Sequence, residues 1–185
     1  MSDLNNRKIA ILAVDGFEES ELIEPKKALE AAGAHVEVLS ENYGEIQGYR
    51  HDQPGAKVKV DRTFEEIHIE DFTGIVLPGG SRNAARARHI PRVRQIIWEM
   101  DRARKPIASI CHGAWELVSA DVVTGRKMTS APKIQDDVRK AGGVWEDSEV
   151  VVDQNFVTSR GPQDLPAFNR ETIALFAKEP VPQTR

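Results

Sequence analysis

The sequence predicts a doubly wound α/β sandwich built around a mostly parallel sheet. Short, nearly continuous apolar runs predict strands that are buried on both faces, which is typical of parallel sheets. The runs are residues 8–14, 71–80 and 106–110. Helical segments separate them, so strands and helices alternate along the chain with right-handed crossovers. In this architecture ligands bind beyond the carboxyl ends of the strands.

The first third of the chain reads as strand, helix, strand and an excursion. The strand at 8–14 leads through turn and capping residues into a helix at 21–33, which ends at a glycine. Residues 34–40 alternate apolar and polar side chains and predict the next strand. Residues 41–57 show no clean period and contain turn residues, so we expect an excursion with a small hairpin before a strand at 58–60.

The rest of the chain continues the alternation of helices and strands. Residues 91–104 predict an amphipathic helix, because a proline opens the segment and its apolar residues fall on one side. Two apolar runs around Asp153–Gln154 predict a pair of strands. The expected elements are helices at 91–104, 112–120, 134–143 and 164–179, and strands at 106–110, 127–130, 149–153 and 155–160.

Length and composition indicate one globular domain over residues 1–185, with tails at about 1–7 and 180–185. The net charge of −4 gives no general attraction for nucleic acid. No apolar run approaches the roughly 20 residues of a membrane span, and the polar amino terminus does not look like a signal peptide. A single cysteine is typical of a reducing interior, so we expect a cytoplasmic protein.

Chemically useful residues follow three of the expected strands, at the point where each strand ends. The residues are Glu18, Glu19 and Glu21 after the first strand, Gly79 and Gly80 after the second, and Cys111 after the third. The carboxyl ends of parallel strands share one edge of a sheet, so we expect these groups to meet in space.

Cys111 has the sequence context of a nucleophile on a tight turn between a strand and a helix. Such a turn holds the nucleophile clear of the sheet, and Gly113 lets it close without a side-chain collision. A helix starting at His112 would aim free N–H groups at the thiol and lower its pKa. The backbone N–H groups of His112 and Gly80 would form an oxyanion hole, and the His112 side chain would accept or donate a proton.

Each of these features has an ordinary structural explanation. A lone cysteine is more often a small buried apolar residue than a nucleophile. A histidine often satisfies a backbone carbonyl, a glycine pair commonly forms a turn, and acids near a helix start complement its dipole. The combination of the three features at one sheet edge is what favours a catalytic site.

Four motifs resemble the ThiJ/PfpI superfamily, and within it the branch of PfpI-type intracellular proteases and general stress proteins. The likeness covers about residues 8–176, with the motifs in the family's order and spacing. The motifs are GFEESEL at 16–22, IVLPGG at 75–80, SICHG at 109–113, and EVVVD with VTSR between 149 and 160. The resemblance implies a flavodoxin-like three-layer sandwich, as in class I glutamine amidotransferases. It also implies a homodimer or a hexamer, with no metal and no organic cofactor.

The resemblance assigns roles to individual residues. It places the family nucleophile at Cys111, the neighbouring histidine at His112, and the acid beside the sulfur at Glu21. It places the oxyanion donor at Gly80. A protonated Glu21 would donate a hydrogen bond to the thiolate, whereas an ionised Glu21 would raise the thiol pKa by repulsion.

Two positions depart from the family pattern, and both concern His112. The glutamate that reaches the histidine from the next subunit in PfpI-type proteases falls on Ala84. The histidine or tyrosine that other branches place before a proline falls on Ala131. His112 therefore lacks its expected orienting partner, which weakens the case for efficient proteolysis.

Nearby arginines offer either a site for anionic substrates, a contact with a second subunit, or a solvated helix face. They are Arg82, Arg86, Arg88, Arg92 and Arg94. The solvated face is the more common use of such a charge run.

Three functions compete for this sequence. The first is a cysteine-dependent hydrolase that attacks amides or reactive carbonyls, such as dicarbonyls and glycation adducts, in stress protection. The second is a redox-sensing stress or chaperone protein in which Cys111 is oxidised. A flavin or nucleotide binder is the third, but the chain has neither GxGxxG nor GxxxxGK.

Overall fold

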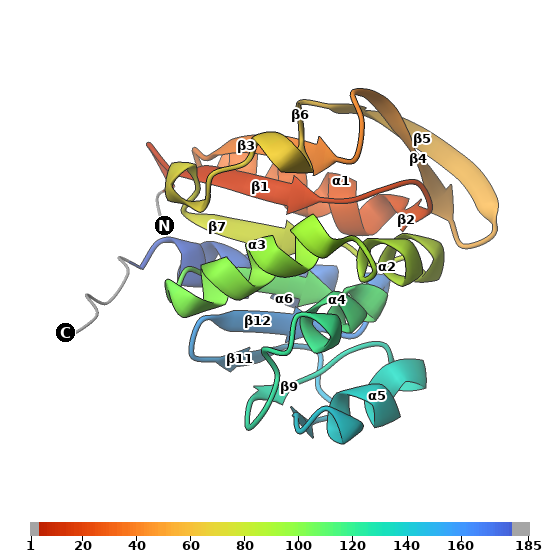
Figure 1. Ribbon diagram of the computed structural model, residues 1–185, viewed down its shortest axis with the longest axis vertical. Coiled ribbons are helices and arrows are strands. Elements are labelled where there is room, and N and C mark those ends of the chain that lie inside the picture. The colour runs from red at the N-terminus through yellow and green to blue at the C-terminus, as the bar shows by residue number, and fades with distance from the viewer. Residues whose placement is uncertain (1–3, 179–185) are drawn as a thin grey trace.

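A computed structural model describes residues 4–178 of the chain. Its central sheet has seven strands in the order β11-β12-β8-β7-β1-β3-β6, and β11 alone runs antiparallel to its neighbour in this sheet. Figure 1 shows the strands stacked between two layers of helices. The strands are β1 (Lys8–Leu12), β3 (His35–Ser40), β6 (Arg62–Thr63), β7 (Gly74–Leu77), β8 (Ile107–Ile110), β11 (Val151–Asp153) and β12 (Phe156–Ser159). This is the α/β sandwich that the sequence predicts.

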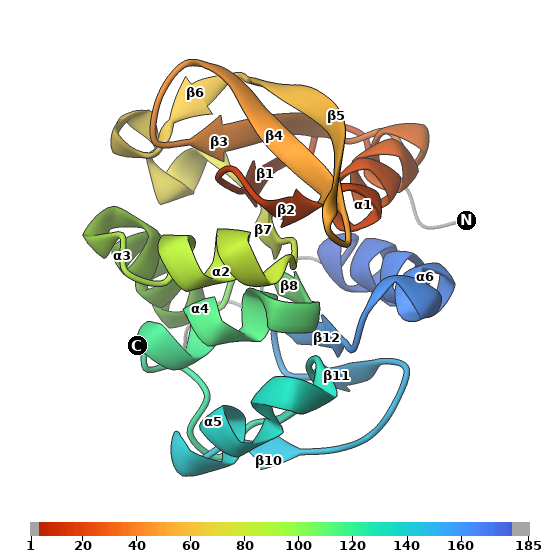
Figure 2. The ribbon, with the colours of Figure 1, turned by 90° about the vertical axis from the view of Figure 1, so that its right-hand side faces the viewer.

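Helices cover both faces of this sheet. Figure 2 shows α1 and α6 on one side, and α2, α3 and α4 on the other. The helices are α1 (Glu19–Ala31), α2 (Ser81–Ala87), α3 (Pro91–Arg102), α4 (Ala114–Ser119), α5 (Gln135–Lys140) and α6 (Leu165–Phe176). The sequence pattern did not single out α2, which is only seven residues long.

Two apolar cores, one on each face, hold the layers together. Along β1, Ile9 and Ile11 belong to the core under α1 and α6, whereas Ala10 and Leu12 belong to the core under α3 and α4. All four side chains are buried, as expected for a central parallel strand whose successive residues point to opposite faces. The continuous apolar run in the sequence is therefore explained by burial on both sides.

The excursion after β3 is a long hairpin rather than a small one. Strands β4 (Gly44–Arg50) and β5 (Gln53–Val60) pair antiparallel and, with β2 (Phe17–Glu18), form a separate three-stranded sheet. Figure 1 shows this hairpin projecting from the body of the sandwich. A small two-stranded sheet pairs β9 (Lys127–Met128) with β10 (Val144–Trp145) near α5.

The expected tails fall partly inside the described residues. Leu4 is fully buried, and its backbone N–H donates to the carbonyl of Ala32 at 2.9 Å. Residues 4–7 therefore pack against the end of α1, while residues 1–3 and 179–185 lie outside the described part of the chain.

Candidate active site

The carboxyl ends of β1, β7 and β8 bring together Glu21, Gly79 and Cys111. The expectation was wrong for the carboxylates of Glu18 and Glu19, which turn to the β4–β5 hairpin and accept hydrogen bonds from its backbone N–H groups. Figure 2 looks toward this edge of the molecule, where α1, α2 and α4 begin. A Cβ atom added to Gly79 would collide with the carboxyl group of Glu21 and lie 2.6 Å from Cβ of Cys111. Glu21, Gly79 and Cys111 therefore share one closely packed contact.

The backbone at Cys111 adopts a conformation that side chains rarely occupy. Its φ angle is 61°, directly after the extended Ile110 with φ −128°. Such a conformation costs about 1–3 kcal/mol and is typical of functional sites. Gly113 has a helical φ of −55°, so a left-handed conformation does not explain the glycine. A Cβ there would lie 2.6 Å from the carbonyl oxygen of Leu77, so the turn needs glycine for space.

Two backbone N–H groups face the sulfur of Cys111. They belong to His112 and Gly80, and both act to lower the pKa of the thiol. Gly80 has a φ of 91°, and a Cβ there would lie 2.6 Å from the nitrogen of Glu18, so this position accepts only glycine. The two N–H groups predicted as oxyanion donors thus both lie beside the candidate nucleophile.

Asn83 fixes the loop that carries Gly80. This fully buried side chain accepts a hydrogen bond from the N–H of Val14 at 2.8 Å. It donates to the carbonyls of Pro78 and Gly79 at 3.1 and 3.2 Å. The loops after β1 and β7 are consequently tied to each other through one amide.

Glu21 is a fully buried carboxyl beside the sulfur. Burial, and next the charge of Glu18, raise its pKa to about 8. Neither oxygen makes a regular hydrogen bond within residues 4–178, although the N–H of Gly79 and the Cys111 sulfur lie close enough to act on the pKa. Glu21 therefore holds its proton at neutral pH.

The thiol pKa differs from the sequence-based expectation. Burial raises the pKa of Cys111, and an ionised Glu21 raises it further, while the N–H groups of His112 and Gly80 act in the opposite direction. The expectation considered only the start of the helix and omitted the cost of burying a charged sulfur. Because Glu21 is protonated at neutral pH, its repulsion is absent there, and its proton is available to the sulfur.

His112 lies against both the nucleophile and an aromatic ring. Its Nδ1 is 3.2 Å from Sγ of Cys111, and its ring meets Trp115 edge to face, with 5.1 Å between centroids. Burial, and next the charge of Lys133, lower the pKa of His112. The imidazole is consequently neutral at physiological pH and able to accept a proton.

The two family positions that should orient His112 are buried alanines. Ala84 is fully buried on α2, and Ala131 is buried beside the turn at Cys111, where its N–H donates to the carbonyl of Cys111 at 3.1 Å. Among residues 4–178, no carboxylate makes a hydrogen bond to His112. As expected from the sequence, His112 thus lacks the orienting partner that the family pattern supplies at these two positions.

The arginines divide among several structural contacts. Arg82 stacks over Tyr49, Arg86 pairs with Glu41 at 2.5 Å, and Arg92 donates to backbone carbonyls of the segment before β7. Arg88 donates to Ser119 at 2.8 Å and stacks over Trp115. These contacts account for four of the five arginines without an anionic substrate.

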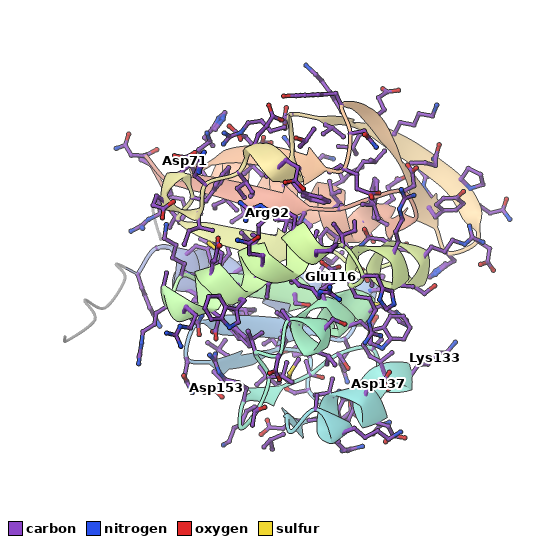
Figure 3. All side chains as sticks on the ribbon, in the orientation of Figure 1. Asp71, Arg92, Glu116, Lys133, Asp137 and Asp153 are labelled. Atoms are coloured by element: carbon purple, nitrogen blue, oxygen red, sulfur yellow. The ribbon has the colours of Figure 1, made fainter. Side chains whose placement is uncertain are left out.

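Sequence reasoning missed Trp115 and Asp137. Trp115 follows His112 by three residues, which is the spacing of side-chain neighbours on a helix, so the sequence held this signal. Asp137 accepts a hydrogen bond from Nε1 of Trp115 at 2.7 Å across 22 residues of sequence, which no local pattern reveals. Figure 3 places Asp137 on α5, with Lys133 toward the outer edge of the molecule.

Glu116 is a second buried carboxyl close to the site in sequence. Burial alone raises its pKa well above the usual value, and neither oxygen has a hydrogen-bond partner within residues 4–178. Figure 3 shows Glu116 within the helical layer near α4. No charged residue contributes to its pKa shift, which distinguishes it from Glu21.

Other features of residues 4–178 do not compete with this site. A groove of about 770 Å³ lies between α3 and the short helix η2 (Ile69–Asp71), and Trp98 lines it, but Cys111, His112 and Glu21 do not. The groove is lined by no cysteine, serine or threonine, so Cys111 stays the candidate nucleophile. In this part of the chain no group of three histidine, cysteine or acidic side chains is arranged to hold a metal, and no helix is long and apolar enough to cross a bilayer.

Comparison with known proteins covers nearly the whole chain. The model of the DJ-1/PfpI family matches residues 7–175. The chain is 45% identical over 168 residues to Deglycase PfpI of Pyrococcus furiosus, covering 91% of this chain and 98% of that protein. It is 39% identical over 175 residues to Protein/nucleic acid deglycase 2 of Escherichia coli, covering 92% and 98%.

The fold is shared with solved structures as well. A two-domain protein from Anabaena variabilis, with DJ-1/ThiJ/PfpI-like and ferritin-like domains, superimposes with a TM-score of 0.87 at 30% identity. The match covers 91% of this chain and 48% of that one. With its sandwich, its strained cysteine and these matches, the chain belongs to the DJ-1/PfpI family.

Proposed function

We propose that the protein is a cysteine-dependent hydrolase that acts on reactive carbonyl compounds and amides in stress protection. The observation that carries the proposal is the strained Cys111, whose sulfur faces two backbone N–H groups and a buried, protonated Glu21. Two relatives named deglycases, each at least 39% identical over almost the full length, support the same chemistry.

In this proposal the Cys111 thiolate adds to an electrophilic carbonyl carbon. The carbonyl π electrons move to oxygen, and the N–H groups of Gly80 and His112 stabilise the resulting oxyanion. The Glu21 proton stabilises the thiolate before the addition. The neutral His112 ring, 3.2 Å from the sulfur, accepts the thiol proton and returns it to the leaving group.

Two substrate classes fit this sequence of steps. With an amide, the carbon–nitrogen bond breaks, the amine leaves with a proton, and water hydrolyses the thioester to a carboxylic acid. With an α-ketoaldehyde, the hemithioacetal rearranges internally by proton transfer to a 2-hydroxy thioester, and water then releases a 2-hydroxy acid. Neither reaction consumes an external oxidant or reductant.

Efficient proteolysis is not part of the proposal. A general base must itself be held in place, and Ala84 and Ala131 offer His112 no polar side chain. An activated carbonyl carbon reacts with a thiolate more readily than the carbon of a peptide bond does, so reactive carbonyl compounds suit this site better.

Methylglyoxal consumption with lactate detection tests the proposal. The wild type should form lactate, and Cys111→Ala should lose at least about 1,000-fold of the rate, because the covalent step disappears. Glu45→Gln is the control, since Glu45 is exposed and lies on the β4–β5 hairpin rather than at the site. A Cys111→Ala variant with the full rate would overturn the proposal.

A second candidate is redox sensing by the same thiol, and the partial exposure of Cys111 favours it. Hydrogen peroxide would oxidise the thiolate to a sulfenate with release of water, and a second equivalent would give a sulfinate. Protonated Glu21 would then donate a hydrogen bond to the new oxygen. The intact mass after mild peroxide should rise by about 16 or 32 Da, and an unchanged mass would exclude this role.

We further propose that the protein works as a homodimer, alone or assembled into a hexamer, in the cytoplasm. Exposed large apolar side chains on several elements give contact surfaces, and a reducing compartment keeps the lone thiol free. They are Tyr43, Trp98, Val144 and Val152. Light scattering after size exclusion should give a dimer or hexamer mass, and a monomer at micromolar concentration would contradict the assembly.

A further inference from the structure

His112 lacks a carboxylate partner, yet its ring is not left free. Trp115, one turn further along, packs against it with 5.1 Å between ring centroids and 65° between the planes. Edge-to-face pairs with this geometry are favourable beyond the apolar area that they bury. The contact limits rotation of the imidazole, whose Nδ1 lies 3.2 Å from Sγ of Cys111.

Trp115 is itself held from two other elements. Its Nε1–H donates to Oδ2 of Asp137 on α5 at 2.7 Å. The guanidinium of Arg88, at the end of α2, lies over the indole ring at 5.2 Å and is tied to Ser119 by a 2.8 Å hydrogen bond. The indole is therefore fixed by a hydrogen bond at its edge and a cation over its face.

The charged groups around His112 come from several elements. Lys133, on the short helix η4 (Pro132–Ile134), raises the cost of a positive charge on the imidazole. Asp137 and Arg88 both act on Trp115 rather than on the histidine. On the other side, His112 meets the Cys111 sulfur, beyond which lies Glu21. Among the described residues, Trp115 is thus the side chain that links His112 to an acid on the side away from the sulfur.

We propose that Trp115 is the positioning residue for His112, and that Asp137 acts through Trp115 in place of the acid missing at Ala84. The inference rests on the proposed function, because it names the residues that orient His112, the proton acceptor of that function. Asp137 orients the indole, the indole orients the imidazole, and the imidazole keeps Nδ1 toward the sulfur.

Substitutions on α5 test this relay without touching the nucleophile. Asp137→Ala should lower kcat for methylglyoxal by about 3- to 10-fold with KM changed less than 2-fold, because substrate contacts stay intact. Asp137→Asn keeps an oxygen acceptor and should recover most of kcat. The matched control is Asp136→Ala, since Asp136 is an exposed neighbour on the same helix that pairs with Arg139.

A double-mutant cycle separates the relay from general damage to α5. Trp115→Phe keeps a ring but loses the N–H donor, so it should cost about as much kcat as Asp137→Ala. The double variant should be no worse than either single variant, because both remove the same hydrogen bond. Additive losses would contradict the relay.

Proton NMR of the His112 ring supplies a readout that does not depend on turnover. The protein has five histidines, so a His112→Gln spectrum assigns the signal. In Trp115→Leu the His112 pKa should rise, since the ring gains solvent, while Asp136→Ala should leave the titration unchanged. If Trp115→Leu fails to fold, Asp137→Ala should still shift the His112 ring signals.

The outcomes separate this inference from the proposed function. Unchanged His112 signals and unchanged kcat in both Asp137→Ala and Trp115→Phe would overturn the relay, even with Cys111 essential. A Cys111→Ala variant with full activity would overturn the proposed function instead, and the NMR titration would still decide whether Trp115 orients the ring.

Discussion

The two sides of Cys111 are built by different rules. On the sulfur side, Glu21, Gly79 and Gly80 pack so closely that neither glycine tolerates an added methyl group. On the histidine side, the family positions are the alanines Ala84 and Ala131, and His112 rests on an aromatic ring. The first side depends on steric fit and one buried proton, whereas in our proposal the second relies on Trp115 and Asp137 in place of the family's acid. The proposed nucleophile and its proposed base can therefore be tested by separate substitutions.

The largest expected effect is on the sulfur side. Gly80→Ala should destabilise the fold by about 3 kcal/mol or more and abolish activity, because the new Cβ meets backbone atoms around Phe17 and Glu18 at a φ of 91°. Gly44→Ala is the control, since Gly44 has a φ of 111° with nothing within 4 Å of an added Cβ. Gly44→Ala should lower the free energy of unfolding, measured in urea, by only about 1 kcal/mol, because of backbone strain. Equal costs at the two positions would show that close packing at Gly80 is unimportant.

A substitution on the histidine side tests whether the missing acid can simply be restored. Ala84→Glu should destabilise the protein by about 3 kcal/mol without raising activity, because the side chain at this position is fully buried in the protomer. Ala85→Glu, on the exposed side of the same helix, should change stability by less than about 0.5 kcal/mol. A stable and more active Ala84→Glu variant would mean that the histidine side still accepts the family's acid.

The pH dependence of stability should reveal the buried proton of Glu21. Below the unfolded value of 4.5 both states are protonated, whereas between 4.5 and about 8 only the folded state keeps the proton. Keeping a proton that the unfolded chain releases costs stability as pH rises. Relative to Glu21→Gln, the wild type should thus lose about 1.4 kcal/mol per pH unit in this window. Urea unfolding at pH 5, 6 and 7 measures the slope, and parallel curves would contradict a protonated Glu21.

Glu116→Gln is the matched comparison for this measurement. Burial also raises the pKa of the Glu116 carboxyl group. Removing this group should therefore reduce the loss of stability with rising pH, as Glu21→Gln does. Because no charged partner contributes to its shift, alkylation of Cys111 should stay within about 2-fold of the wild-type rate. A large change in alkylation would indicate that Glu116 belongs to the reactive site.

The sequence allowed the fold to be predicted largely because burial on both faces leaves continuous apolar runs such as 8–14 and 106–110. The roles of Cys111 and Gly113 in the turn could also be predicted from the sequence, since the strand-to-helix turn is local. The direction of the shift in the thiol pKa could not be predicted, because it depends on burial among residues that are distant in the sequence. The contact between Trp115 and Asp137 joins α4 to α5 and is likewise tertiary.

The pH profile of Cys111 alkylation by iodoacetamide, in wild type and Glu21→Gln, shows whether Glu21 keeps its proton beside the sulfur. If protonated Glu21 donates to the thiolate, Glu21→Gln should alkylate about 10-fold more slowly at pH 7, because an amide is a weaker donor than a carboxylic acid. If Glu21 were instead ionised beside the sulfur, removing its charge would lower the thiol pKa. A Glu21→Gln variant that alkylates faster than the wild type at pH 7 would contradict the account.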